Sequence, residues 1–223
     1  MVLHKRYGQG DEKPWRGIKS NDDRRECNEV MRMMHEAAGQ GNADAQCNLG
    51  FMYAYGQGVA KDEFTAVKWY RNAAEQGHAD AQCNLGAMYE NGKGVAKDEF
   101  TAVKWYRKAA EQGLADAQHN LGFVYDNGKG VAKDEYTAVK WYRKAAERGH
   151  ADAQHNLGFM YDNGKGVAKD EFTALRWYRK AAEQGLADAQ CNLGAMYATG
   201  QGVAKDEFTA VKWYRKAAEQ GHA

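Results

Sequence analysis

Proline and serine are nearly missing from this chain of 223 residues, since Pro14 and Ser20 are the single examples of each, against 25 glycines. Disordered glycine-rich segments usually contain many serines and prolines, so this composition argues against disorder. An excess of one charge is missing as well, because 31 basic residues oppose 30 acidic ones. The net charge of +1 predicts no general attraction to nucleic acid or to an anionic membrane. No apolar run reaches the roughly 20 residues of a membrane-spanning helix, so we expect neither nucleic acid nor membrane as a partner.

Signals for export and for disulfide bonds are also sparse. The residues that follow Met1 contain no apolar run of the kind that a signal peptide needs. Four cysteines in a chain of this length do not form a disulfide framework. We therefore expect a reducing, cytoplasmic environment, with the periplasm as the alternative if a leader has been removed.

Glycine, by contrast, is abundant and periodic. One glycine recurs every 36 residues, at Gly41, Gly77, Gly113, Gly149, Gly185 and Gly221. Most positions between these glycines are identical in five copies, which span residues 42–77, 78–113, 114–149, 150–185 and 186–221. A fixed period of this length predicts a solenoid of stacked supersecondary units, and therefore one continuous array.

Each copy contains the pattern of two helices. In the first copy, an apolar residue at every fourth position predicts a first helix from Ala43 to about Ala54. A wider apolar face predicts a second helix from about Glu63 to Gln76, with Asp62 as its N-cap. Gly77 fits the position after the helix, where glycine adopts a left-handed conformation without penalty. The sequence therefore predicts an all-α solenoid of helix-turn-helix repeats with a 36-residue period.

The first copy shares with the others the residues Ala43-Asp44-Ala45-Gln46, Leu49-Gly50, Tyr53, Gly56, Gly58-Val59, Asp62, Ala66, Trp69-Tyr70-Arg71, Ala73-Ala74-Glu75 and Gly77. With this motif, residues 42–221 resemble the Sel-one-like repeats, which are relatives of the tetratricopeptide repeats. The resemblance implies a right-handed α-solenoid and a role as an adaptor that assembles protein complexes. One departure lies before the Asn-Leu-Gly of the first helix, where the family often has an aromatic residue. That place is taken here by Cys47, Cys83, His119, His155 and Cys191.

The two ends of the chain fit the repeat less well. Within residues 1–41, the segment 30–41 matches a second helix and the segment 7–10 matches the end of a first helix and its turn. We expect a degenerate partial repeat that serves as a cap. At the other end, Gly221-His222-Ala223 is the start of a further copy. A terminal helix without a cap exposes apolar surface, which leads to the hypothesis of a homodimer through this end.

The positions that vary between copies lie on one stripe of the first helix, opposite its core side, at spacings i, i+4, i+7 and i+8. In the related tetratricopeptide repeats, matching positions line a concave groove that holds an extended peptide. The resemblance thus implies a groove for a peptide or a partner protein, whereas neutral variation on a solvated face is the alternative. An asparagine ladder beside the stripe can offer donors and acceptors to a peptide backbone. The candidate residues are Cys47, Asn48, Phe51, Tyr55, Cys83, Asn84, Glu90, His119, Asn120, Phe123, Asp126, His155, Asn156, Phe159, Asp162, Cys191 and Asn192.

The stripe contains acidic residues as well as cysteines and histidines. Its middle copies are acidic, which favours a basic ligand segment. Its cysteines and histidines could bind a metal, but neighbouring helices lie roughly 8–10 Å apart and a zinc ligand lies about 2.0–2.3 Å from the ion. We therefore expect no metal and no other cofactor.

Catalysis has little support in the sequence. Activity against β-lactams has been suggested for cysteine-rich relatives, but Ser20 lacks the S-x-x-K context of such enzymes. A cysteine nucleophile needs a base within hydrogen-bond reach, and Cys83 and His119 lie in adjacent copies. The sequence favours a non-enzymatic adaptor, with a metal-binding groove or a β-lactam-hydrolysing relative as alternatives.

Overall fold

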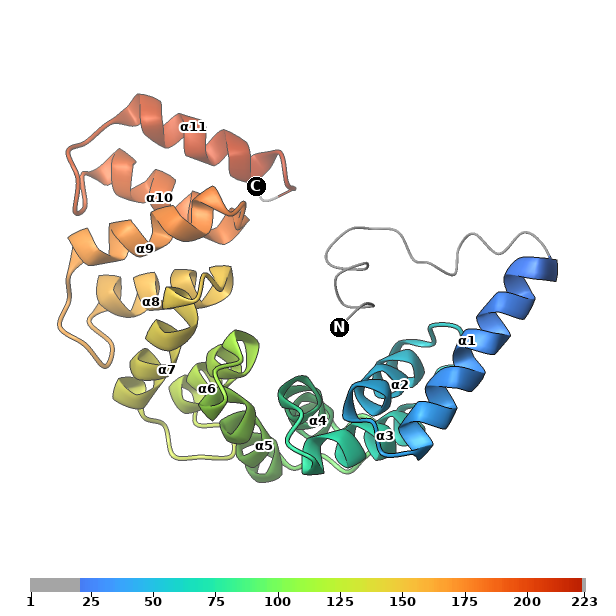
Figure 1. The fold of residues 1–223 in the computed structure, drawn as a ribbon. Coiled ribbons are helices and arrows are strands. Elements are labelled where there is room, and N and C mark those ends of the chain that lie inside the picture. The colour runs from blue at the N-terminus through green and yellow to red at the C-terminus, as the bar shows by residue number, and fades with distance from the viewer. Residues whose placement is uncertain (1–20, 222–223) are drawn as a thin grey trace. The chain divides into compact units, whose positions relative to one another are not determined.

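The computed structural model describes residues 21–221, and the side chains from Glu29 onward, as two compact units that divide after His78 (Figure 1). Every regular element in this described part is a helix. Unit 1 holds α1 (Asn21–Gly39), α2 (Ala43–Tyr55) and α3 (Glu63–Glu75). Unit 2 holds α4 (Ala79–Asn91), α5 (Glu99–Glu111), α6 (Ala115–Asn127), α7 (Glu135–Glu147), α8 (Ala151–Asn163), α9 (Glu171–Glu183), α10 (Ala187–Thr199) and α11 (Glu207–Ala218).

The predicted all-α solenoid is confirmed, because first and second helices alternate with the 36-residue period of the sequence. The predicted turn at 7–10 and the predicted further copy at His222-Ala223 lie outside the described residues. The proposal that 1–41 is a degenerate repeat stays a prediction. His35 of α1 contacts the Tyr53 hydroxyl, and two repeats later Arg107 of α5 donates to the hydroxyl of Tyr125 at the equivalent place. None of the helices from residue 21 to 221 is long and apolar enough to cross a membrane.

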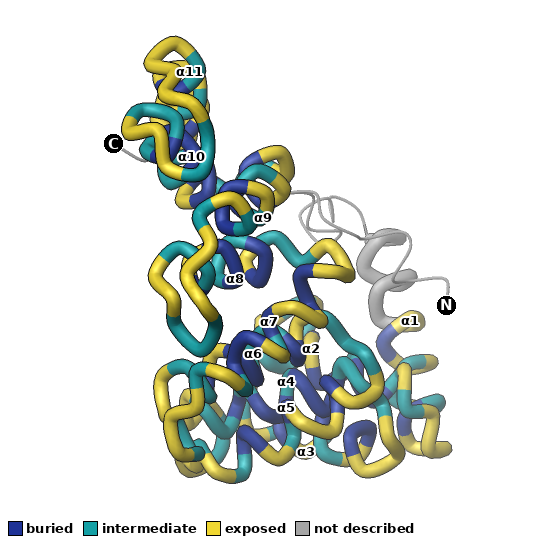
Figure 2. The backbone as a smooth tube through the Cα atoms, turned by 90° about the vertical axis from the view of Figure 1, so that its left-hand side faces the viewer, coloured by how far each residue is buried: buried dark blue, intermediate teal, exposed yellow. Residues whose placement is uncertain are grey.

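In unit 2 each helix packs against the helices before and after it in sequence. The first helices α4, α6, α8 and α10 form one layer, and the second helices α5, α7, α9 and α11 form the other. Buried and exposed stretches alternate along these helices (Figure 2). Each repeat therefore contributes its own part of a continuous core between the two layers.

Within a repeat, a glycine of the first helix packs directly on a tyrosine of the second. In the first four repeats the tyrosine at this place is buried, with Tyr70 at 2% exposure and Tyr142 at 1%. A Cβ on Gly50 would lie 2.5 Å from Cδ1 of Tyr70, and a Cβ on Gly122 would lie 2.6 Å from Cδ1 of Tyr142. Such distances are far inside van der Waals contact, so the hairpin closes only because these positions lack a side chain.

The turn between the two helices is fixed by capping groups. In the third repeat, Gly128 ends α6 with a φ of 69°, and its amide donates to the Val124 carbonyl. Asp134 then caps α7 by accepting from the amide of Thr137 at 3.0 Å and from its hydroxyl at 2.6 Å. These hydrogen bonds lower the pKa of Asp134. The predicted N-cap and glycine positions of the repeat are thus confirmed in detail.

A ladder of buried glutamines joins one repeat to the next. The side-chain amides of Gln118 and Gln154 donate to the carbonyls of Ala110 and Ala146, at the end of the preceding second helix. The side-chain oxygen then accepts from a second glutamine, as Gln154 does from Gln184 at 2.7 Å. Gln46, Gln82 and Gln190 accept in the same way.

The ladder has one defect. The residue that would donate to Gln118 is Arg148, where the other copies have glutamine. The Oε1 atom of Gln118 is buried and has no hydrogen-bond partner. Leaving a buried acceptor unpaired costs about 1–3 kcal/mol.

We predict that Arg148→Gln raises the midpoint of thermal unfolding, because Gln118 gains the donor that Gln154 already has. A gain of about 1 kcal/mol in the free energy of unfolding is expected. The mirror variant Gln184→Arg, which takes the donor from Gln154, should lower the midpoint. Circular dichroism melts of the three proteins measure both changes. An unchanged or lower midpoint for Arg148→Gln would show that the unpaired oxygen carries no cost.

Candidate functional site

The exposed side of the first helices in unit 2 carries the candidate site, which we call the first-helix face. Its centre consists of Phe123 and Asp126 on α6 and of Phe159 and Asp162 at the same places on α8. The two phenylalanines are 37% and 38% exposed. The spacing i, i+3 puts each pair on one side of its helix. Adjacent repeats therefore present the same aromatic and acidic pair twice.

Charge on this face has one sign along the helices. The helices α4, α6, α8 and α10 contain aspartate and glutamate but neither lysine nor arginine. Partial burial raises the pKa of Asp162 above the usual value for aspartate. Two lysines reach the face from the turns, with Lys129 Nζ 4.7 Å from the Phe123 ring centre and Lys165 Nζ 4.8 Å from that of Phe159.

The sequence analysis missed these two turn lysines. The signal that could have found them is that their position also varies between copies, being glutamine at Gln57 and Gln201. The variable positions extend beyond the end of the first helix into the turn. This turn folds back, so that Lys129 lies over the Phe123 ring of α6.

The asparagine ladder has a different role from the one that its chemistry suggested. The amide of Asn156 lies 3.1 Å from Nε2 of His119, and the amide of Asn192 lies 2.9 Å from Nε2 of His155. Asn120 donates to the Cys83 sulfur at 3.6 Å. In these three repeats the asparagine and the residue of the Cys/His column bind each other across neighbouring first helices. Their donors therefore hold the layer together and are not free for a ligand.

The cysteines of the stripe are placed inside the molecule. Cys47 and Cys83 are buried, and Cys191 is half-buried. Burial raises the pKa of Cys83 to about 12, so this thiol is not ionised near neutral pH. Cys47 and Cys83, predicted to line the groove, thus contribute to the core. In the described part of the chain, no three His, Cys, Asp or Glu residues lie together as a metal site would require.

The remaining predicted residues are distributed as follows. Phe51 and Tyr55 lie exposed on α2 of unit 1, with their ring centres 4.6 Å apart. Glu90 accepts from the hydroxyl of buried Tyr106 at 2.7 Å, so its carboxylate anchors the core as well as facing outward. Asn48 and Asn84 are half-buried. The structure therefore brings Phe123, Asp126, Phe159 and Asp162 to the surface of one unit.

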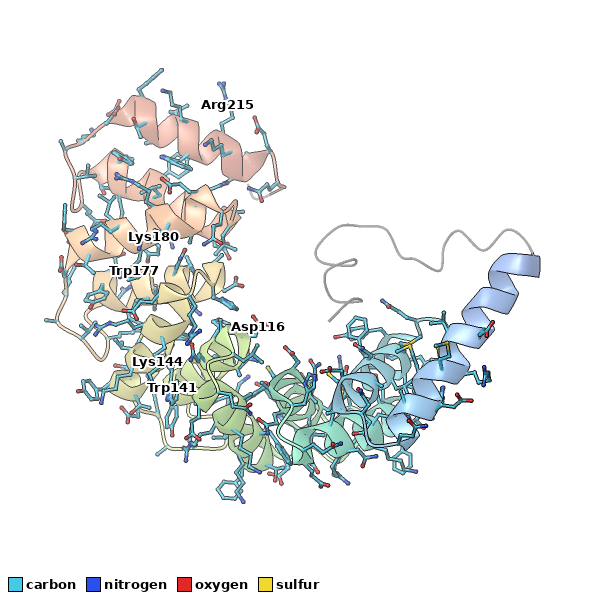
Figure 3. All side chains as sticks on the ribbon, in the orientation of Figure 1. Asp116, Trp141, Lys144, Trp177, Lys180 and Arg215 are labelled. Atoms are coloured by element: carbon cyan, nitrogen blue, oxygen red, sulfur yellow. The ribbon has the colours of Figure 1, made fainter. Side chains whose placement is uncertain are left out.

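A pair of histidines lies at the junction of the third and fourth repeats. The rings of His119 and His150 stack with centres 4.7 Å apart and planes at 14°. His150 caps α8, because its Nδ1 accepts from the Ala153 amide, and its Nε2 lies 3.3 Å from Oδ1 of Asp116, the residue labelled in Figure 3. The hydrogen bond from His150 lowers the pKa of Asp116. The signal in the sequence was the alternation of histidine and leucine at this position.

We predict that the protein loses stability as the pH falls below the ordinary histidine pKa of about 6.5. Burial, together with the neighbouring His150, lowers the pKa of His119, and burial lowers that of His155. Just below the ordinary histidine pKa of about 6.5, the unfolded chain therefore binds more protons than the folded one. The stabilisation is complete above that pH and is lost as the pH falls toward the lowered pKa values.

Thermal melts across this pH range test the prediction with a matched variant. His119→Cys with His155→Cys introduces the residue that other copies have at this place, and it should reduce the drop in melting temperature. His35→Arg removes a histidine from α1 and should keep the drop. If the double cysteine variant shows the same pH dependence as the wild type, these two histidines do not cause it.

Comparison with solved structures gives several similar proteins. A Sel1 repeat protein from Oxalobacter formigenes is 42% identical, with a TM-score of 0.81 over 87% of this chain and 80% of that chain. A protective antigen of uropathogenic Escherichia coli with an SLR fold is 41% identical, with a TM-score of 0.84 over 87% of this chain. The present chain spans only 42% of that antigen. A putative sel1 repeat protein from Klebsiella pneumoniae, 23% identical with a TM-score of 0.56 over 85% of this chain and 92% of that chain, shares the fold.

Comparison with curated protein sequences gives no match. The sequence pattern described as the Sel1 repeat matches five consecutive segments, at residues 43–78, 79–114, 115–150, 151–186 and 187–222. These segments follow the helical hairpins of the structure one by one. The chain therefore belongs to the Sel1 repeat family.

Proposed function

We propose that this protein is a non-catalytic adaptor that holds a basic segment of a partner protein on the first-helix face of unit 2. Sel1 repeat solenoids commonly serve as scaffolds for protein interactions. The partner and its segment are the specific part of the proposal. The observation that carries it is the repeated pair of an exposed phenylalanine and an aspartate on α6 and α8.

The chemistry of this face supports a basic ligand. Exposed aromatic side chains supply apolar contact area at low entropic cost, and the nearby carboxylates attract cationic side chains. The first helices themselves add no positive charge that would oppose such a ligand. Lys129 and Lys165 lie against the aromatic rings, where a ligand residue can replace them.

The repetition of the pair suggests the spacing of the ligand. Packed helices lie roughly 8–10 Å apart, and an extended chain advances about 3.3 Å per residue. Equivalent carboxylates on neighbouring repeats would therefore meet residues about three positions apart in an extended segment. We expect lysine or arginine at this spacing, with an apolar residue between them.

The alternatives from the sequence gain no support from the same residues. The Cys83 thiol is buried and neighbours the amide of Asn120, which is not a base. The His119 ring accepts from Asn156 and stacks on His150. These groups are engaged in holding the repeats together, which favours a scaffold over metal binding or hydrolysis of a β-lactam.

A peptide array in which the number and spacing of lysines vary tests the adaptor function. The wild type should retain the peptides with lysines about three residues apart. Asp126→Lys with Asp162→Lys should weaken this binding about tenfold or more, since each exposed ion pair contributes up to about 1 kcal/mol. Phe123→Ala with Phe159→Ala should also weaken it.

The control for this experiment reverses two charges in the other layer. Glu111→Lys with Glu147→Lys changes the net charge by the same amount at exposed positions of α5 and α7. Binding should persist in this variant. If the wild type retains no basic peptide, or if the aspartate and glutamate variants lose binding equally, the first-helix face is not the site.

A second mode of association, a homodimer through α11, is favoured by one observation. Val211 and Tyr214 are 56% and 40% exposed, whereas Val139 and Tyr142 at the same places of α7 are 4% and 1% exposed. Such an apolar face is stabilised when a partner covers it. We predict that sedimentation equilibrium detects a dimer that Val211→Asp dissociates. A wild type that remains monomeric at high concentration would rule this dimer out.

A further inference from the structure

The second helices of unit 2 present a ladder of aromatic rings to solvent, which we call the second-helix face. Phe100, Tyr136, Phe172 and Phe208 stand at the same place of successive repeats and are between 59% and 71% exposed. Rings that only pack in the core would be buried, so packing does not explain this exposure. Exposed apolar side chains that lie together mark interaction surfaces. The ladder belongs to the opposite layer from the first-helix face.

Lysines lie over three of the four rings of this ladder, those of Phe100, Tyr136 and Phe208. The Nζ atom of Lys104 lies 4.1 Å from the Phe100 ring centre, and that of Lys140 lies 4.0 Å from the Tyr136 ring centre. A parallel row of tryptophans carries lysines as well, namely Trp105 with Lys108, Trp141 with Lys144, Trp177 with Lys180 and Trp213 with Lys216, all at 4.1–4.3 Å. Figure 3 labels the second and third of these pairs. Each repeat thus offers ammonium groups held over aromatic faces.

The acidic residues on these helices do not cancel this charge. Each of α5, α7 and α9 has three basic and two acidic residues. The first glutamate of each helix is paired with a lysine of the preceding turn, as Glu99 is with Lys97 at 2.8 Å and Glu135 with Lys133 at 2.8 Å. Lys104 and Lys140 also interact with the capping aspartates Asp98 and Asp134, and each helix keeps a net positive charge for a ligand.

We infer that the second-helix face binds an acidic protein segment that carries apolar side chains between its carboxylates. The carboxylates pair with the lysines, and the apolar groups pack on the exposed edges of the rings. Single-stranded nucleic acid stacks its bases on ring faces, and one face of Phe100, Tyr136 and Phe208 already carries an ammonium group 4.0–4.1 Å from the ring centre. This ligand is opposite in charge to the one proposed for the first-helix face, so the two sites are independent.

Two labelled peptides test the inference by fluorescence anisotropy at low salt. One repeats Glu-Glu-Leu and the other repeats Glu-Glu-Ser. The wild type should bind the leucine peptide more tightly, because only this peptide can use the ring edges. Phe100→Ala with Tyr136→Ala should remove the difference between the peptides. An oligo-dT strand and phosphatidylserine vesicles serve as competing ligands.

A matched pair of quadruple variants locates the site. Replacing Lys104, Lys108, Lys140 and Lys144 by glutamine should weaken binding about tenfold or more. Replacing Lys97, Lys133, Lys169 and Lys205 by glutamine removes the same charge from the turns and should weaken it less than about threefold. Asp126→Lys with Asp162→Lys should leave this binding intact, which separates it from the proposed adaptor site.

Several outcomes would overturn the inference. Equal losses in the two quadruple variants would mean that only net charge attracts the peptide. Equal affinity of the wild type for the leucine and serine peptides would mean that the rings take no part. Tighter binding of the oligo-dT strand or of the vesicles would assign the face to another class of ligand.

Discussion

The close contact of a buried tyrosine with a glycine is the constraint on which each repeat depends. It sets the distance between the two helices of a hairpin, because no side chain fits between Gly122 and the ring of Tyr142. It also connects the core with the surface, since the hydroxyl of Tyr106 reaches Glu90 on the neighbouring first helix. The residues of the first-helix face are therefore positioned by rigid packing. A binding surface built on such packing loses little entropy when a ligand is bound.

Between repeats, hydrogen bonds of polar side chains hold the helices together, and one of these bonds is missing at one junction. In four of the five repeats, an exposed glutamine at the end of the second helix donates to the buried glutamine of the first helix, whereas Arg148 leaves Gln118 without its donor. The same junction holds the stacked His119 and His150. It lies between the two repeats that carry the phenylalanine and aspartate pairs. The unpaired glutamine oxygen and the stacked histidines thus lie beside the residues of the proposed first-helix site.

Much of the fold follows from the period, and the limits of the site prediction have a physical cause. The 36-residue repeat, the aspartate caps and the turn glycines determine the helical hairpins, and the predicted ends agree with α2 and α3 to within one residue. Sequence spacing identifies the side of a helix on which a residue lies, but it does not reveal how far the neighbouring repeat covers that side. Cys83 was therefore expected in the groove and is buried, and the donor of Asn156 was expected to be free and is used by His119.

The net charge of the sequence is limited in a similar way, because it does not show how charge is distributed between the two helix layers. A net charge of +1 describes the field of the whole chain at a distance. Salt screens charges over about 8–10 Å, which is close to the distance between packed helices. A ligand that touches one layer therefore responds mainly to that layer, which is acidic along α6 and α8 and basic along α5 and α7. The net charge of the whole chain excludes a general attraction to a polyanion. Each helix layer can still attract a ligand of the opposite charge.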